Sequence, residues 1–167
     1  MGAPEPPPSH LAVLHRVSGI VASSRTLSEM LAELVRLVAE ITSSDACLVY
    51  LLDKENRQVV LRASQLPHAA EVGTLRLDLG EGVTGWVAEH GSVVSLPSDA
   101  WRDSRFKGLP ALVEDSYQAF LSVPLVAGGE AIGVINVHHK QPHQHSAEEI
   151  ALLSFVGEQL GGAITRA

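Results

Sequence analysis

The spacing of apolar residues changes along the chain and predicts the order of its helices and strands. Apolar residues recur at helical intervals from Leu11 to Val21 and again from Leu27 to Ile41. Thr26 and Glu29 have the spacing of a capping box at the start of the second run. Shorter apolar or alternating runs predict strands at Ala46–Leu52, Gln58–Ser64, Thr74–Leu79, Val93–Leu96, Ala119–Val126 and Ala131–Val137.

Three further helices are predicted between and after these strands. A short helix covers Val83–His90 and ends before Gly91, and a second begins at Pro110. Ser146 starts a long terminal helix that runs to about Thr165. Because hairpin-connected strands are preceded and followed by helices, the predicted fold class is α+β, an antiparallel β-sheet flanked by helices.

Composition bounds the class of protein. The chain has 167 residues, of which 46% are hydrophobic and 19% charged, so it is long enough for one domain with a substantial core. A net charge of −7 argues against a nucleic-acid partner, and a single cysteine excludes an internal disulfide. No apolar run reaches the roughly 18 residues of a membrane span, and the Pro-rich start lacks the features of a signal peptide. The expected location is the cytoplasm, with no membrane partner.

The segment Gly80–Gly85 matches the spacing G-x-G-x-x-G, which in dinucleotide-binding proteins places a pyrophosphate at a helix N-terminus. That geometry needs a crossover of at least about 10–12 residues that returns to a parallel strand. Because the next strand is already expected at Val93, a dinucleotide site is not predicted. The glycines instead allow a tight turn and close contact between helix and sheet. No motif typical of a hydrolase, a metalloprotease or a P-loop enzyme occurs in the chain.

Aromatic residues are concentrated in one stretch of the sequence. An aromatic wall with few polar groups is typical of a small-molecule pocket, but the same side chains would equally pack beneath a long loop. Both interpretations stay open. Five of the seven aromatic residues belong to this stretch: Trp86, Trp101, Phe106, Tyr117 and Phe120.

The same stretch supplies three cations, Arg102, Arg105 and Lys107, in an otherwise acidic chain. An arginine fork would suit a carboxylate or phosphate group of a ligand. The favoured interpretation is that these cations pair with Asp99 and Asp103 on a solvated loop.

Four histidines precede the terminal helix closely: His138, His139, His143 and His145. If the last strand continues, the first two point to opposite faces of the sheet. Because all four lie in one connection rather than on several rigid elements, no metal site is expected, and a solvent-facing connection is predicted. Cys47 lies in an apolar run, where a thiol is expected to be an inert core residue.

The terminal helix carries a narrow apolar stripe. Its spacing is close to that of a coiled-coil seam, although the stripe is shorter than three heptads. Pairing with another helix and packing on the chain's own sheet are both open. The stripe consists of Ile150, Leu153, Val156, Leu160 and Ile164.

Several motifs together resemble the GAF family of small regulatory domains. They are D-A-C-L-V-Y-L-L-D, L-R-L-D-L-G-E-G-V-T-G-W-V-A-E-H-G, F-L-S-V-P-L-V and G-V-I-N-V, followed by S-A-E-E-I-A-L-L. The resemblance spans Leu27–Ile164 and implies a three-layer sandwich in which the N- and C-terminal helices pack together. It divides the chain into a disordered tail at 1–8, an N-terminal helix at 9–25 and a sensory domain at 26–167.

The resemblance also implies a function. GAF domains of bacterial signal-transduction and transcription-regulatory proteins sense small molecules without catalysis and couple binding to dimer helices. The implied partners are an unknown small-molecule ligand, a second copy of the chain bound through the terminal helices, and an output domain after Thr165. No catalytic residue, cofactor or metal is expected. The residues expected to contact the ligand are Trp86, Asp99, Trp101, Arg105, Phe106, Tyr117, Phe120 and Ser122.

Three better-defined groups of the family can be compared with this chain at the residues that carry their function, and the chain departs from each of them there. Cyclic-nucleotide-binding domains carry an N-K…F…D-E pattern, but Asn136 is followed by Val137, and His145 stands where Phe is expected. Pigment-binding domains use a cysteine in the pocket, whereas Cys47 lies on the first strand. Free methionine sulfoxide reductases work through several cysteines, and this chain has one, so that activity is a distant alternative. The main alternative is a dimerisation module with a filled pocket.

Overall fold

A computed structural model describes residues 10–65, 71–108 and 116–166. The tail at 1–8 and the helix expected at Pro110 lie outside these residues. The elements in chain order are α1 (His10–Ser23), α2 (Leu27–Thr42), β1 (Ala46–Asp53), β2 (Gln58–Ser64), β3 (Arg76–Asp78), α3 (Gly82–His90), β4 (Val94–Leu96), η1 (Ala100–Arg102), β5 (Ala119–Ala127), β6 (Glu130–His139) and α4 (Ala147–Arg166).

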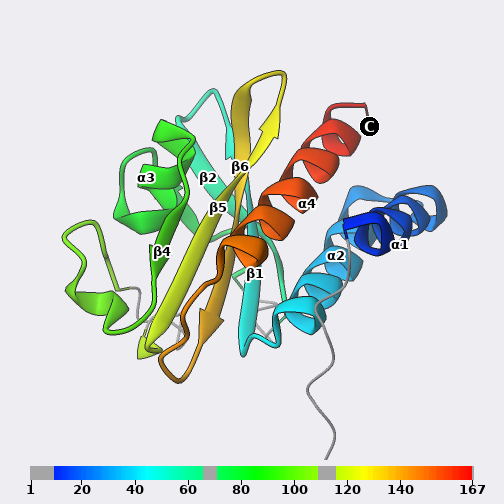
Figure 1. Ribbon diagram of the computed structural model, residues 1–167. Coiled ribbons are helices and arrows are strands. Elements are labelled where there is room, and N and C mark those ends of the chain that lie inside the picture. The colour runs from blue at the N-terminus through cyan, green and yellow to red at the C-terminus, as the bar shows by residue number, and fades with distance from the viewer. Residues whose placement is uncertain (1–9, 66–70, 109–115, 167) are drawn as a thin grey trace, which may run out of the picture.

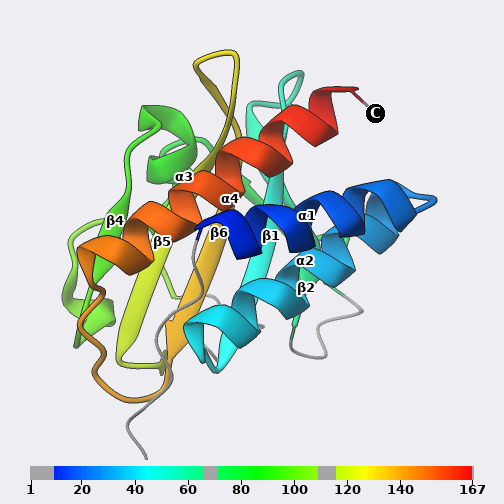
Figure 2. The ribbon, with the colours of Figure 1, turned by 45° about the vertical axis from the view of Figure 1, so that its right-hand side comes forward.

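The strands form one curled sheet between two layers of helix. Its order is β3-β2-β1-β6-β5-β4, and every neighbouring pair is antiparallel. Helices α1, α2 and α4 lie on one side of the sheet, and α3 lies on the other (Figures 1 and 2). This arrangement confirms the predicted α+β class. It also confirms that no dinucleotide-binding crossover exists here, because α3 connects antiparallel strands.

Alternate residues of the central strands enter two separate cores. On β1, Cys47, Val49 and Leu51 pack under the three long helices, while Leu48 and Tyr50 face the α3 side. This alternation follows from the two-residue period of a strand whose faces are both covered. Burial raises the pKa of the Cys47 thiol well above its usual range, so the thiol stays protonated and inert as predicted.

Helix α4 packs directly on β5, and this packing decides the use of its apolar stripe. Leu153, Val156 and Leu160 are fully buried in the core between the long helices and the sheet. Gly157 and Gly161 face the backbone carbonyls of β5 and permit the close approach. The stripe therefore packs on the chain's own sheet, which was one of the two open interpretations.

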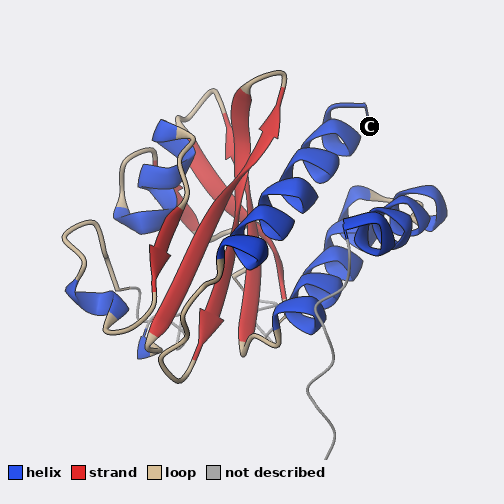
Figure 3. Cartoon of the chain, in the orientation of Figure 1, coloured by secondary structure: helices blue, strands red, loops and turns tan. Residues whose placement is uncertain are grey.

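Local sequence signals set most element boundaries, which can be followed in Figure 3. The Thr26 hydroxyl accepts a 3.1 Å hydrogen bond from the Glu29 amide at the start of α2, as a capping box requires. The α2 helix ends at Ser43 in the left-handed conformation. The β5–β6 hairpin turns at Gly128 and Gly129, both with positive φ, as two-residue hairpins prefer.

Two predicted strands have different lengths in the structure. The strand expected over Thr74–Leu79 is limited to Arg76–Asp78, because the Thr74 amide bonds back to the Glu71 carbonyl in a turn and Gly80 turns the chain at the other end. The last strand is longer than expected and continues through His139, since β6 pairs with β5 along its whole length.

Replacing Thr26 with Ala is expected to lower the free energy of unfolding by about 1 kcal/mol, because the first turn of α2 loses its side-chain cap. Chemical denaturation of the purified protein measures the change. Ser18→Ala, at an exposed position inside α1, is the control and should change stability by less than about 0.5 kcal/mol. Equal effects of the two variants would contradict the capping role.

Candidate functional site

The candidate site is a small cavity on the α3 side of the sheet. Its floor is made by side chains of four strands: Tyr50, Leu77, Phe120, Asn136 and His138. Its other walls come from the start of α3 and from the loop after η1. The cavity among the described residues has a volume of about 20 Å³, which is room for about one water molecule.

A buried chain of three polar side chains crosses the floor. The Ser122 hydroxyl donates to Asn136 Oδ1 over 2.7 Å, and Asn136 Nδ2 donates to the Thr84 hydroxyl over 2.7 Å. All three residues are buried. Burying polar groups is costly unless they are paired, and here each is paired. The chain of bonds connects α3 to the neighbouring strands β5 and β6 and fixes the orientation of the Asn136 amide at the cavity.

His138 lies beside this network and stacks on Phe120 with ring centroids 4.3 Å apart. Both side chains line the cavity. A flat imidazole next to a carboxamide gives the site hydrogen-bonding groups on an otherwise aromatic and aliphatic wall. Such a surface suits a small molecule with a polar end and an apolar or planar body.

The opposite wall is formed by Gly82, Val83, Phe106 and Lys107. Gly82 has a φ of 68°, which lets the chain enter α3 tightly. The Lys107 ammonium lies 2.6 Å from the Glu81 carboxylate, an ion pair across the entrance between α3 and the following loop. Because Lys107 is exposed, this pair contributes little to stability and is easily opened.

The eight residues expected at the site have different positions in the structure. Phe106 and Phe120 line the cavity, and Ser122 lies one hydrogen bond behind it. Tyr117 is partly buried beside the β1–β2 side of the core, where Lys140 lies over its ring. Trp101 has 43% of its surface exposed and does not line the cavity.

Arg105 and Trp86 contact each other outside the cavity. The Arg105 guanidinium lies 4.7 Å from the centre of the Trp86 ring, which also stacks with His90. Arg105 also makes a 2.8 Å ion pair with Asp103, whose hydrogen bonds from Arg105 lower its pKa. The predicted pairing of the loop cations with Asp99 and Asp103 is thus confirmed for Arg105, but it is wrong for Lys107, which pairs with Glu81. The backbone N–H of Asp99 donates to the side-chain oxygen of Gln118, the residue before β5, which holds this loop beside the start of that strand.

Sequence reasoning missed the main polar groups of the cavity, namely Asn136, Thr84 and His138. A signal was present for Asn136, because an amide in the middle of the apolar run G-V-I-N-V requires a buried partner. No local signal identified the partner, since Thr84 is 52 residues away in sequence.

The interpretation of the histidines as a solvent-facing connection is wrong. His138, His139 and His145 are buried, because β6 is longer than expected and carries the first two into opposite cores. The loop then folds back over the sheet and inserts His145. Among residues 10–65, 71–108 and 116–166, no group of three or more His, Cys, Asp or Glu side chains is placed to hold a metal ion.

Fold and site together define a class, the small α+β regulatory domains that carry a pocket on the sheet face opposite their terminal helices. The GAF domain family model matches residues 26–164. The chain belongs to the GAF domain family.

Proteins similar to this chain include bacterial regulators. The phosphoenolpyruvate-dependent phosphotransferase system protein of Escherichia coli is 27% identical over 93% of this chain and 21% of its own length. A Nif-specific regulatory protein of Azospirillum lipoferum is 26% identical over 92% of this chain and 25% of its own length. The chain thus spans about a fifth to a quarter of these relatives.

Solved structures support the same assignment. The GAF domain of an Acinetobacter phosphoenolpyruvate-protein phosphotransferase is 32% identical, with a TM-score of 0.84 over 95% of this chain and 94% of that one. A free methionine-R-sulfoxide reductase of Neisseria meningitidis is 20% identical, with a TM-score of 0.79 over 98% of this chain and 93% of that one, a likeness of fold alone. In the described part of the chain, none of the helices combines the length and apolar character needed to cross a membrane.

Proposed function

We propose that this GAF domain is a non-catalytic sensor in which a small molecule binds between the sheet and α3. The proposal rests on one observation above all. A fully hydrogen-bonded chain of polar side chains, Ser122–Asn136–Thr84, reaches the cavity. Aromatic side chains form the floor of this cavity, and the side chains of Phe106 and Lys107 cover it. A buried, pre-oriented amide next to an aromatic surface is a typical arrangement for small-molecule recognition.

Binding requires the cover to move, because the cavity holds only about 20 Å³. The exposed Lys107–Glu81 pair is the contact to break, and Phe106 is the only apolar side chain that the described part of the loop contributes to the wall. Displacing them shifts the start of α3, and through Thr84 and Asn136 the shift reaches β6. Since β6 continues toward α4, ligand binding would bias the terminal helices, where we place the dimer contact and the link to an output domain.

The similarity to the phosphotransferase and Nif-regulatory proteins supports a role within a larger signalling or transcription-regulatory protein. A catalytic role on the pattern of the sulfoxide reductases is disfavoured by Cys47. It is the only cysteine of the chain, it is buried on the face away from the cavity, and burial keeps it protonated.

The small cavity favours one second candidate, a dimerisation module whose pocket is filled by its own side chains. Native mass spectrometry of the freshly purified protein, repeated after denaturation, separates the two. An added mass that is lost on denaturation supports the sensor. A ligand-free dimer that binds nothing from a library of amino acids, oxoacids, inorganic anions and nucleotides supports the dimerisation module.

Replacing Phe106 with Ala is expected to weaken binding of the retained molecule at least about tenfold, because the pocket loses the apolar side chain that encloses it. Trp101→Ala is the matched control, since Trp101 lies in the neighbouring η1, is 43% exposed and does not line the cavity. Binding is measured by calorimetry with the molecule identified by mass spectrometry. An unchanged affinity in Phe106→Ala would place the ligand elsewhere.

A further inference from the structure

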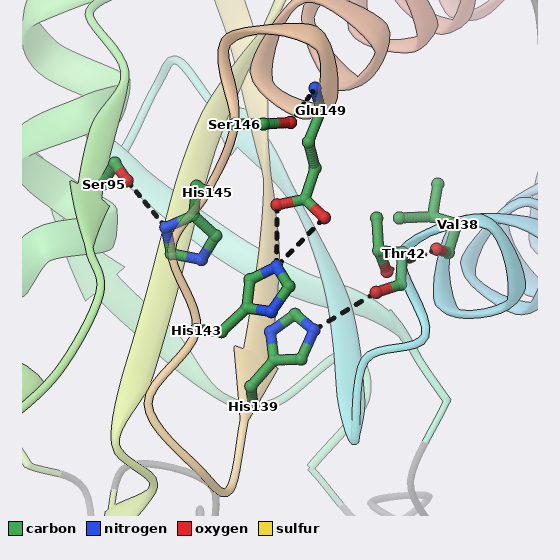
Figure 4. Close-up of polar contacts among 8 residues, drawn as sticks. All are labelled: Val38, Thr42, Ser95, His139, His143, His145, Ser146 and Glu149. Atoms are coloured by element: carbon green, nitrogen blue, oxygen red, sulfur yellow. Dashed lines mark hydrogen bonds and ion pairs between the residues drawn. The ribbon is translucent and has the colours of Figure 1, made fainter. Parts of the chain in front are cut away.

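Three histidines gather on the opposite side of the sheet from the candidate site, where the chain enters α4 (Figure 4). The rings of His139 and His143 stack almost in parallel, with centroids 3.9 Å apart and an interplanar angle of 6°. His145 meets His143 edge-on at 5.2 Å. His139 belongs to β6, whereas the other two come from the connection that follows it.

Each of the three histidines contacts a different part of the fold. His145 Nδ1 lies 2.6 Å from the Ser95 hydroxyl on the edge strand β4. His143 Nε2 lies 3.0 Å from the Glu149 carboxylate in the first turn of α4. His139 Nε2 lies 3.2 Å from the carbonyl oxygen of Thr42 at the end of α2. Together the three contacts fix the positions of α4, β4 and the α2–β1 turn relative to one another.

Two buried nitrogens of the cluster, Nδ1 of His139 and Nε2 of His145, have no hydrogen-bond partner among the residues that the structure describes. A bare imidazole lone pair is tolerable in such a place, but an N–H without an acceptor is costly. Neutral His145 avoids an unpaired N–H when its proton is on Nδ1 and is donated to the Ser95 hydroxyl, which leaves only a lone pair on Nε2. A second proton would create a buried N–H on Nε2 with no acceptor.

The charges around the cluster do not offset this cost at His145. Glu149 from α4 contacts His143, and the charges of Glu149 and of Asp45, the residue before β1, favour the protonated form of His139 rather than of His145. On β5, the residue opposite His139 is the uncharged Ala119. From β4 the group that meets His145 is the Ser95 hydroxyl. The N-terminus of α4 adds a partial positive charge, which also disfavours a cation.

We propose that His139, His143 and His145 form an acid-sensitive clasp, which fastens the start of α4 to the sheet when the buried rings are neutral and releases it on acidification. The clasp lies on the face away from the candidate site and does not depend on a ligand there. The clasp responds to acidification of the cytoplasm or of its local surroundings, and the response is a change in the position of the first turn of α4.

The direction of the pH effect follows from burial. Burial lowers the pKa of His139, and burial together with the neighbouring histidines lowers that of His145 to about 4. A released histidine titrates near 6.5. The released form therefore binds protons more readily, so the clasp is stable above about pH 6.5 and weakens as the pH falls from there toward 4.

Amide hydrogen exchange at pH 7.5 and pH 5.0, corrected for the intrinsic effect of pH, tests the clasp. The opening equilibrium of residues 143–150 should increase about thirtyfold at the lower pH, as one site with these two pKa values requires. The α3 helix should show a much smaller change. In His145→Gln the increase should be reduced at least about tenfold, whereas His15→Gln, at an exposed position of α1, should behave as the wild type.

A second measurement needs no variant and remains decisive if His145→Gln does not fold. The imidazole resonances of the wild-type protein are followed by NMR between pH 7.5 and 4.5. A ring of His145 that stays neutral until α4 begins to open supports the clasp. A ring that titrates near pH 6.5 without any change in the exchange of α4 overturns it, as does an unchanged pH response in His145→Gln.

Discussion

Replacing Gly161 with Ala should lower the free energy of unfolding by about 2 kcal/mol, although alanine is the better helix former. A methyl group at this position would overlap the backbone carbonyl of Val126 on β5. Backbone atoms of a central strand cannot move aside as a flexible side chain would, so α4 has to lift from the sheet. That cost exceeds the gain of about 1 kcal/mol expected from helix propensity.

The control substitution is expected to change the free energy of unfolding in the opposite direction. Gly19 lies in α1, and a methyl group there would meet no atom within 4 Å. Gly19→Ala should therefore raise stability by up to about 1 kcal/mol. Urea denaturation followed by circular dichroism measures both variants. If Gly161→Ala were as stable as Gly19→Ala, α4 would not pack on β5 as closely as described here.

Replacing Asn136 with Ala should lower the free energy of unfolding by about 3 kcal/mol. The substitution removes two buried hydrogen bonds of 2.7 Å and leaves the hydroxyls of Ser122 and Thr84 without this partner. It also opens a cavity beneath α3. Unpaired buried polar groups and the lost packing each cost on the order of 1–3 kcal/mol.

Asn56→Ala is the matched control for Asn136. Asn56 is exposed in the β1–β2 turn, where its amide bonds to the Asp53 carboxylate over 2.8 Å. Its replacement should cost less than about 1 kcal/mol, because water takes over the bond. Thermal unfolding compares the two variants. A loss in Asn136→Ala no greater than in Asn56→Ala would contradict the network, whatever the pocket binds.

The elements of this fold were predictable because their signals are local. Helix periodicity, the Thr26 cap and the paired glycines of the last hairpin each act within a few residues of sequence. The assignment of strand faces was predictable as well, since alternate residues of a strand must point to opposite sides. Hence the predictions of the α+β class and of a buried Cys47 are confirmed.

The candidate site was only partly predictable. The aromatic stretch supplies Phe106 and Phe120 to the wall of the candidate cavity. Sequence could not separate these two from Trp86 and Trp101, because lining a cavity and covering a loop demand the same kind of side chain. The conformation of the loop separates them, because Arg105 pairs with Asp103 and lies over the Trp86 ring outside the cavity.

By itself, then, the sequence determined which segments are helix or strand and where most of them end. Tertiary structure alone decided which partners the buried polar residues contact. Thr84 meets Asn136 across 52 residues, Ser95 meets His145 across 50, and Thr42 meets His139 across 97. Such pairs form only after the sheet has brought distant segments together. No local pattern in the sequence identifies the partner of a buried polar group.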